Sequence, residues 1–160
     1  MEKNNTVPTA IAFIGFVAIF LVVVFLVRGN VDKNKIESQE KEAAEVGELP
    51  DMSLFICGKT FTAKTDRTRV AKSFQEHLPL ILEMKDGADG KVGVVYFKFI
   101  TNVKILKEVQ AGDILIYGDS EVLIVYKTHK VSDKFTKIGH IDNITDLPTG
   151  ECGAKISIIE

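Results

Sequence analysis

The chain has 160 residues, with 20 basic side chains, 22 acidic side chains and a formal net charge of −2. Residues 50–160 carry 15 basic and 15 acidic side chains, so this part lacks the broad positive surface that nucleic-acid binding requires. Two cysteines are too few for a disulfide scaffold, and the three histidines are isolated, so the sequence predicts no metal site and no cofactor.

The N-terminal part is predicted to be a membrane anchor. Residues 7–27 are uncharged, and a helix of this length rises about 31 Å at ~1.5 Å per residue, which matches the hydrocarbon core of a bilayer. The alternative is a cleaved signal peptide. Because the apolar run exceeds the usual ~7–15 residues and no small-residue cleavage pattern follows it, we expect an uncleaved anchor over residues 1–28.

Residues 29–49 are predicted to be a charged flexible linker. They contain no aromatic residue and few large aliphatic ones, so they bury too little apolar surface to offset the entropy of folding. Lys3 precedes the apolar run and Arg28, Lys33 and Lys35 follow it, which favours a cytoplasmic domain. The acidic balance of the linker and the signal-anchor layout favour the opposite side. We expect a single-pass protein of the cell membrane with an extracytoplasmic domain.

Residues 50–160 are predicted to form one mainly β domain. Val70, Phe74 and Leu78 recur every four residues, which indicates a helix over 67–77 with Asp66 as its N-cap. A second, short helix is expected at 143–147. Short apolar segments between Gly- and Asp-containing turns predict strands at 53–56, 60–65, 80–85, 92–99, 114–117, 122–126, 135–141 and 155–159. With so few helices to cover them, these strands must bury their faces against one another, which favours a closed or nearly closed barrel.

The domain resembles the small prokaryotic cyclophilin-like domains over residues 52–160. The likeness lies in the order and spacing of AGDILIYG (111–118), LIVYK (123–127) and KIGHI (137–141), preceded by GKTFTA (58–63), AKSF (71–74) and HLPL (77–80). It implies a closed eight-stranded cyclophilin-like β-barrel whose first and last strands lie side by side. It also implies an exported domain, because similar domains are commonly exported.

The resemblance further implies a disulfide. If the first and last strands pair antiparallel, Cys57 at the end of the former lies opposite Cys152 at the start of the latter. A bridge between them would close a loop of about 95 residues. Two free buried thiols are the alternative.

The sequence departs from the catalytic pattern of the cyclophilins. In prolyl isomerases of this kind, an arginine on the strand pair after the first helix donates hydrogen bonds near the proline nitrogen. Residues 80–99 contain Lys85, Lys91 and Lys98 but no arginine, and an ammonium group does not reproduce the planar guanidinium fork. The chain also has no tryptophan. We therefore expect no efficient catalysis.

Aromatic residues concentrate in the second half of the domain. Rings on a shallow surface favour binding of an extended peptide, although filling of the core is an alternative role for most of them. The Asp-Gly pairs near Asp86, Asp89 and Asp113 are typical of turns rather than of a carboxylate site. The predicted ligand-binding residues are Tyr96, Phe99, Tyr126, Phe135 and His140.

The sequence thus predicts a membrane-anchored module that binds a peptide or another ligand without catalysis. One alternative is a weak peptidyl-prolyl isomerase that acts on exported proteins. Another is an assembly surface for a second envelope protein.

Overall fold

The computed structural model of the chain describes residues 46–159. The predicted transmembrane helix at 7–27 and most of the predicted linker lie outside the described residues. None of the helices in residues 46–159 has both the length and the apolar character needed to cross a bilayer.

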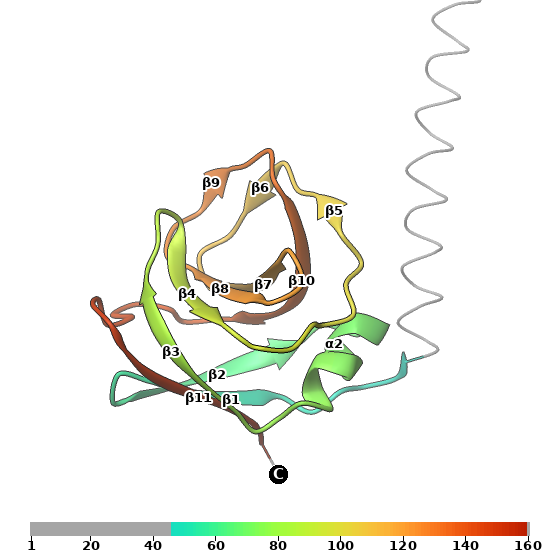
Figure 1. The fold of residues 1–160 in the computed structure, drawn as a ribbon, viewed down its shortest axis with the longest axis horizontal. Helices are drawn as coiled ribbons and strands as arrows, with labels where there is room; N and C mark the ends of the chain where they lie inside the picture. Colours follow the sequence, from blue (N-terminus) through green and yellow to red (C-terminus); the bar gives the residue numbers. More distant parts are fainter. Residues whose placement is uncertain (1–45, 160) are drawn as a thin grey trace, which may run out of the picture. The chain divides into compact units, whose positions relative to one another are not determined.

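The described residues form one short helix and a series of antiparallel strands (Figure 1). In chain order these are β1 (Met52–Ile56), β2 (Lys59–Thr65), α2 (Arg69–Gln75), β3 (Leu80–Asp86), β4 (Gly90–Val94), β5 (Lys104–Ile105), β6 (Glu108–Val109), β7 (Asp113–Tyr117), β8 (Glu121–Val125), β9 (His129–Lys130), β10 (Lys134–Ile141) and β11 (Cys152–Ile158).

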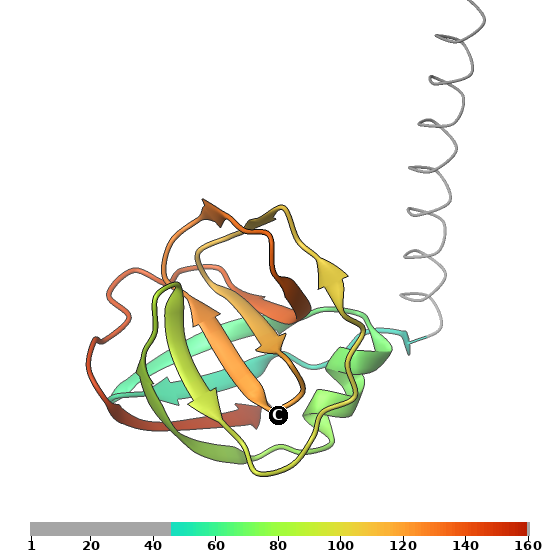
Figure 2. The same cartoon turned by 45° about the horizontal axis from the view of Figure 1, so that its top comes forward.

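Eight of these strands close into a barrel, which confirms the predicted fold. Their order is β2-β1-β11-β3-β4-β8-β7-β10, and β10 pairs again with β2 (Figure 2). The first and last strands are antiparallel neighbours, with Met52 opposite Ile158. At the closing seam, a Cβ on Gly139 would lie 2.5 Å from the carbonyl oxygen of Lys64, so the absence of a side chain lets β10 approach β2.

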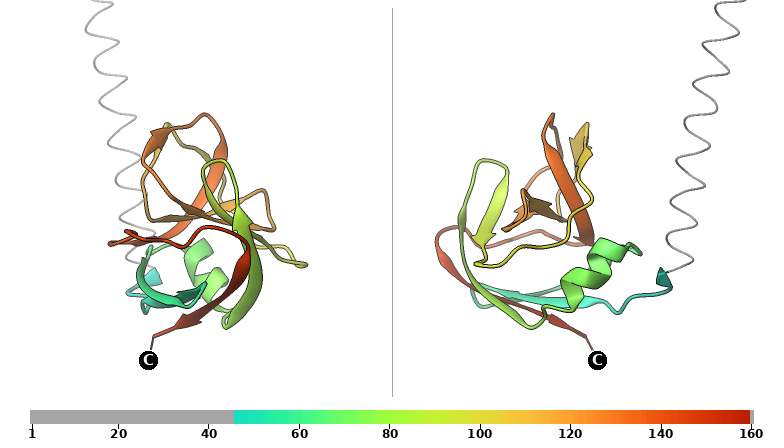
Figure 3. Two further views of the ribbon diagram at one scale, coloured as in Figure 1. Left: turned by 90° about the vertical axis from the view of Figure 1, so that its left-hand side faces the viewer. Right: turned by 45° about the vertical axis from the view of Figure 1, so that its right-hand side comes forward.

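The interior of the barrel holds one apolar core. Alternate residues of each strand point inward, as in β3, where Leu80, Leu82 and Met84 are buried between exposed neighbours. Helix α2 adds its buried residues Val70, Ala71 and Phe74 to the same core. Figure 3 shows α2 beside the β1–β2 hairpin and the connection that follows β4.

The predicted helix starts later than expected, because Thr68 rather than Asp66 caps it. The Thr68 side chain accepts a hydrogen bond from the backbone N–H of Ala71 at 3.1 Å. The backbone N–H of Asp66 instead donates to the carbonyl oxygen of Ile138 at 3.0 Å, which extends the pairing of β2 with β10. Burial raises the pKa of the Asp66 carboxyl above its ordinary value.

Two other predictions of local structure are wrong. Residues 143–147 form a turn rather than a helix, and Asp146 has a φ of +68°, which a continuing helix does not allow. The strand predicted at 92–99 ends at Val94. Val95 and Phe99 donate backbone hydrogen bonds to Ser120 and Asp119, at 2.9 and 2.7 Å, and both side chains are buried. The three residues between them are therefore pushed outward as a bulge.

A second apolar cluster lies outside the barrel wall. It is built on the outward residues of β7, β8 and β10, namely Leu115, Leu123, Val125 and Phe135. The short strands β5, β6 and β9 run above these strands at the top of Figure 1, and Leu106, Val109 and Val131 close the cluster. The sequence patterns predicted none of these three short strands.

Candidate functional site

Two parts of the outer surface of the sheet differ in how they are covered. We call the outer faces of β7, β8 and β10, with the residues that cover them, the covered half. We call the outer faces of β3 and β4 the open half. In the open half the outward residues Ile81 and Val94 are 77% and 51% exposed. Exposed apolar side chains on adjacent strands are typical of a binding surface.

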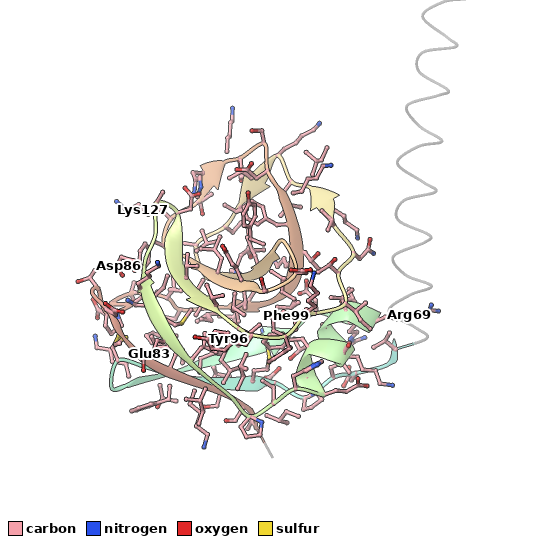
Figure 4. The ribbon with its side chains drawn as sticks, viewed as in Figure 1. Arg69, Glu83, Asp86, Tyr96, Phe99 and Lys127 are labelled. Carbon is pink, nitrogen blue, oxygen red and sulfur yellow. A yellow bond between two sulfur atoms is a disulfide. The ribbon has the colours of Figure 1, made fainter. Side chains whose placement is uncertain are left out.

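The open half contains a hollow of about 480 Å³. Its volume lies within the range of ~300–1,000 Å³ that is usual for sites of small ligands. Figure 4 labels Glu83 on β3 and Tyr96 just after β4, which both line it. The lining residues are Leu80, Ile81, Leu82, Glu83, Met84, Lys85, Val92, Val94, Val95, Tyr96, Phe97 and Glu151.

Tyr96 is the fully exposed aromatic residue of the hollow, and a column of rings supports the bulge that carries it. Phe97 stacks on the imidazole of His77 with the ring centres 4.8 Å apart. Phe99 lies 5.0 Å from Phe97 and 5.2 Å from Phe74 of α2, so the column runs from the core to the surface. Val95 is buried on one side of Tyr96 and these rings hold the backbone on the other, so Tyr96 is presented to solvent by a rigid support.

Three charged side chains complete the hollow. Glu83 and Lys85 are outward residues of β3, and Glu151 lies just before β11. The described part of the structure shows no ion pair to Lys85. The hollow therefore combines an apolar floor with two carboxylates and an ammonium group, which suits a ligand that carries both apolar and charged groups.

A hydrogen-bond network around Asp86 holds one side of this rim. The Asp86 carboxylate accepts hydrogen bonds from Lys91 Nζ at 2.8 Å, from the backbone N–H of Gly150 at 2.6 Å and from the hydroxyl of Tyr126. Lys91 is fully buried and also donates to the carbonyl oxygen of Gly150 at 2.6 Å. The hydrogen bonds from Lys91 and Tyr126 lower the pKa of Asp86 to about 2. Burial and the bond to Asp86 raise the pKa of Tyr126.

A disulfide holds the other side of the rim. The structure joins Cys57 to Cys152, with 5.3 Å between the Cα atoms and 95 positions between them in the sequence. Cys152 lies opposite Met84 on β3. Glu151 is thus flanked by Gly150, which the Asp86 network binds, and by Cys152, which is bonded covalently. Both neighbours of this rim residue are fixed before any ligand arrives.

The five residues predicted to line one groove do not gather in one place. Tyr96 lines the hollow, whereas Phe99 is buried in the barrel core and Phe135 is buried in the covered half. Tyr126 belongs to the Asp86 network, and His140 lies elsewhere, against Asp113. A role of Tyr96 in ligand binding stays a prediction. The sequence patterns missed Ile81, Val94 and Phe97, although outward apolar residues in a strand of alternating pattern were a usable signal.

His140 is part of a separate polar cluster. Its Nδ1 lies 2.9 Å from a carboxylate oxygen of Asp113, and Lys137 Nζ lies 2.7 Å from the same oxygen. Burial alone would raise the pKa of Asp113, but the hydrogen bonds from Lys137, the backbone of Gln110 and His140 outweigh it and lower that pKa. Asp86 and Asp113 thus belong to different networks. Within residues 46–159 no three potential metal ligands come together.

Comparison with known proteins gives one match. Residues 54–155 match the family model described as the cyclophilin-like family. This range begins within β1 and ends within β11, so it includes part or all of every barrel strand, and it covers more than half of the chain. No curated protein and no solved structure matches the chain significantly.

Proposed function

This chain belongs to the cyclophilin-like family, and on that premise we propose that its barrel binds an extended peptide in the hollow of the open half without isomerising it. The observation that carries the proposal is the fully exposed Tyr96 beside an apolar hollow whose rim is fixed. Aromatic anchors beside apolar pockets supply most of the binding energy in many interfaces. A rim that is already ordered reduces the entropy cost of binding.

A peptide suits the shape and chemistry of the hollow. Apolar side chains of the ligand would contact Ile81 and Val94, and its prolyl or aromatic rings would stack on Tyr96. Glu83 and Glu151 outnumber Lys85 at the rim, so a peptide with a basic residue is favoured over one with an acidic residue.

The cations near the hollow argue against efficient isomerisation. Lys91 is buried in its ion pair with Asp86, and Lys98 lies 2.7 Å from Asp119. That leaves Lys85 as the cation that lines the hollow in the described residues. An ammonium group on a flexible stem is a poor substitute for a guanidinium fork that must follow a rotating amide.

The membrane location is also part of the proposal. The apolar run at 7–27 would anchor the chain, and the barrel would act outside the cytoplasm, where a disulfide persists.

Binding and catalysis are tested together with proline-containing tetrapeptides that carry either a lysine or a glutamate. Titration into the isotope-labelled chain, followed by NMR, should shift the resonances of Tyr96 and Ile81, with tighter binding of the lysine peptide. Tyr96→Ala should weaken binding by about tenfold or more, as expected for an interface anchor. Tyr117→Ala is the matched control, because Tyr117 is exposed on the outer end of β7.

The same peptides report on catalysis through their rate of prolyl exchange. We expect the uncatalysed rate with the chain present. If the chain accelerates prolyl exchange and Tyr96→Ala or Lys85→Ala abolishes the acceleration, the protein is a weak isomerase and the proposal is wrong. Resonances that shift only outside the hollow would reject it altogether.

A further inference from the structure

An exposed apolar ridge lies on the connection between β4 and β5. Ile100, Val103 and Ile105 are 68%, 46% and 67% exposed, within six consecutive residues. This connection passes α2 along the outside of the barrel and ends in β5, the last strand of the sheet order (Figures 1 and 2). Single exposed aliphatic residues are ordinary, but three within six consecutive residues of a small domain indicate a contact surface.

The ridge is basic as well as apolar. Residues 90–107 contain Lys91, Lys98, Lys104 and Lys107 and no Asp or Glu. Lys134 of β10 is opposite Ile105 and adds a further positive charge. The carboxylates that face this region are Asp119, which binds Lys98, Asp66, which interacts with Lys104, and Asp133 and Glu108 at its far end. Lys104 and Lys107 have no ion pair in the described residues.

We infer that this ridge, Ile100, Val103 and Ile105 with Lys104 and Lys107, contacts the anionic lipid surface of the membrane that anchors the chain. The inference rests on the proposed anchor at 7–27. Apolar side chains interspersed with lysines favour the boundary between headgroups and acyl chains, and the attraction increases with anionic lipid.

The length of the linker makes this contact reachable. Eighteen residues, 28–45, separate the apolar run from the described domain, and even fully extended they span at most ~65 Å. The barrel therefore stays near the bilayer, and the contact forms at the high effective concentration of a tethered group.

A partner strand added to the edge of β5 is the competing occupant. Two observations disfavour it. β5 is only two residues long, and it carries Lys104, while lysines on an edge strand oppose pairing with another chain.

Because the chain has no tryptophan, the fluorescence of a single introduced tryptophan reports only on the surroundings of that position. The full chain is reconstituted into phosphatidylcholine vesicles, with or without phosphatidylglycerol, that contain lipids brominated near the headgroup. Ile105→Trp places the indole on the ridge. Ile81→Trp is the matched control, since Ile81 is at least as exposed as Ile105 and lies on β3, four strands from β10 in either direction around the barrel.

We expect the Ile105→Trp emission to shift to the blue and to be quenched, more strongly with phosphatidylglycerol, while Ile81→Trp stays unquenched. Lys104→Gln and Lys107→Gln should each weaken the contact about fivefold, the equivalent of ~1 kcal/mol per lysine at an anionic surface. Lys155→Gln, on the other side of the barrel, should have no effect.

Flotation after carbonate extraction reports on the anchor separately. If the chain floats with the vesicles but the indole at position 105 stays unquenched, the proposed contact of the ridge is rejected and the proposed anchor is kept. If the chain does not float, both the anchor and the contact of the ridge are rejected. Equal quenching at positions 81 and 105 also overturns the inference, because the contact would then be unspecific.

Discussion

The strands of the covered half and those of the open half have similar outward-facing residues. Both present outward apolar residues on adjacent antiparallel strands. Over β7, β8 and β10 the chain itself returns through β5, β6 and β9 and buries those residues under Leu106, Val109 and Val131. Within residues 46–159 no segment returns in this way over β3 and the end of β4, and Ile81, Val94 and Tyr96 stay exposed. In one half the apolar surface stabilises the fold, and in the other it is left available for a ligand.

The two halves are also held together differently. The covered half is held by apolar packing and by the backbone pairing of the short strands. The rim of the open half is held by a disulfide and by the buried ammonium group of Lys91. These covalent and ionic contacts fix the rim without filling the hollow. The following predictions test this contrast, from the largest effect to the smallest.

Removal of the disulfide should have the largest effect. The double variant Cys57→Ser and Cys152→Ser should lose about 4–5 kcal/mol of unfolding free energy, the chain-entropy value for a loop of 95 residues. Urea denaturation measures this loss, and reduction of the native protein is the control that should reproduce it. Two alkylatable thiols on the unreduced, membrane-derived chain would show that the bond does not form in the cell.

Truncation in the covered half should come next. Phe135 is 4% exposed, and Phe135→Ala should lower the free energy of unfolding by about 3–5 kcal/mol, because it leaves a cavity beneath the short strands. The matched substitution in the open half, Tyr96→Ala, should change it by less than ~0.5 kcal/mol. Equal losses in the two variants would remove the distinction between the halves.

The Asp86 network should make stability depend on pH in acid. The pKa of Asp86 is about 2 in the folded chain against an ordinary 3.8, so its contribution is complete above pH 3.8 and is lost as the pH falls through about 2. Asp86→Asn removes that contribution. Urea unfolding of both proteins should therefore show a difference in stability that narrows from pH 5 towards pH 2. A difference that stays constant over this range would contradict the shifted pKa.

The smallest effect on stability is expected at Ile81. Ile81→Ala removes an exposed side chain and should alter the unfolding free energy by less than ~0.5 kcal/mol. The same change removes part of the apolar lining of the hollow, so peptide binding measured by NMR titration should weaken by severalfold. Ser157→Ala on the neighbouring strand β11 is the control and should leave binding unchanged. A loss of stability without a loss of binding would assign Ile81 to the fold rather than to the site.

The barrel itself was predictable, because alternation in strands such as β3 and the order of the turns are local properties of the sequence. The bulge after β4 was not. Tyr96, Phe97 and Phe99 alternate as a strand would, and the chain turns only because Val95 and Phe99 bond to residues 119 and 120. That contact is tertiary and leaves no periodic pattern.

The covered half was unpredictable for the same reason, since strands of two residues are too short to show a period. The hydroxyl of Tyr126 and the imidazole of His140 bind Asp86 and Asp113, which lie 40 and 27 positions away in the sequence. Aromatic composition alone therefore placed these residues in a groove that they do not form. Tyr96 lines the hollow because the bulge exposes it.

The pairing of β1 with β11 brings the two ends of the barrel together. Met52 faces Ile158, and the N–H of Ile159 donates to the carbonyl oxygen of Asp51 at 2.9 Å. A short peptide joining residue 159 to residue 51 would therefore give a circular permutant, opened for instance in the turn at 143–147 between β10 and β11. Such a rearranged chain would carry its termini between β10 and β11, which would allow a fusion partner to be attached at that end of the barrel.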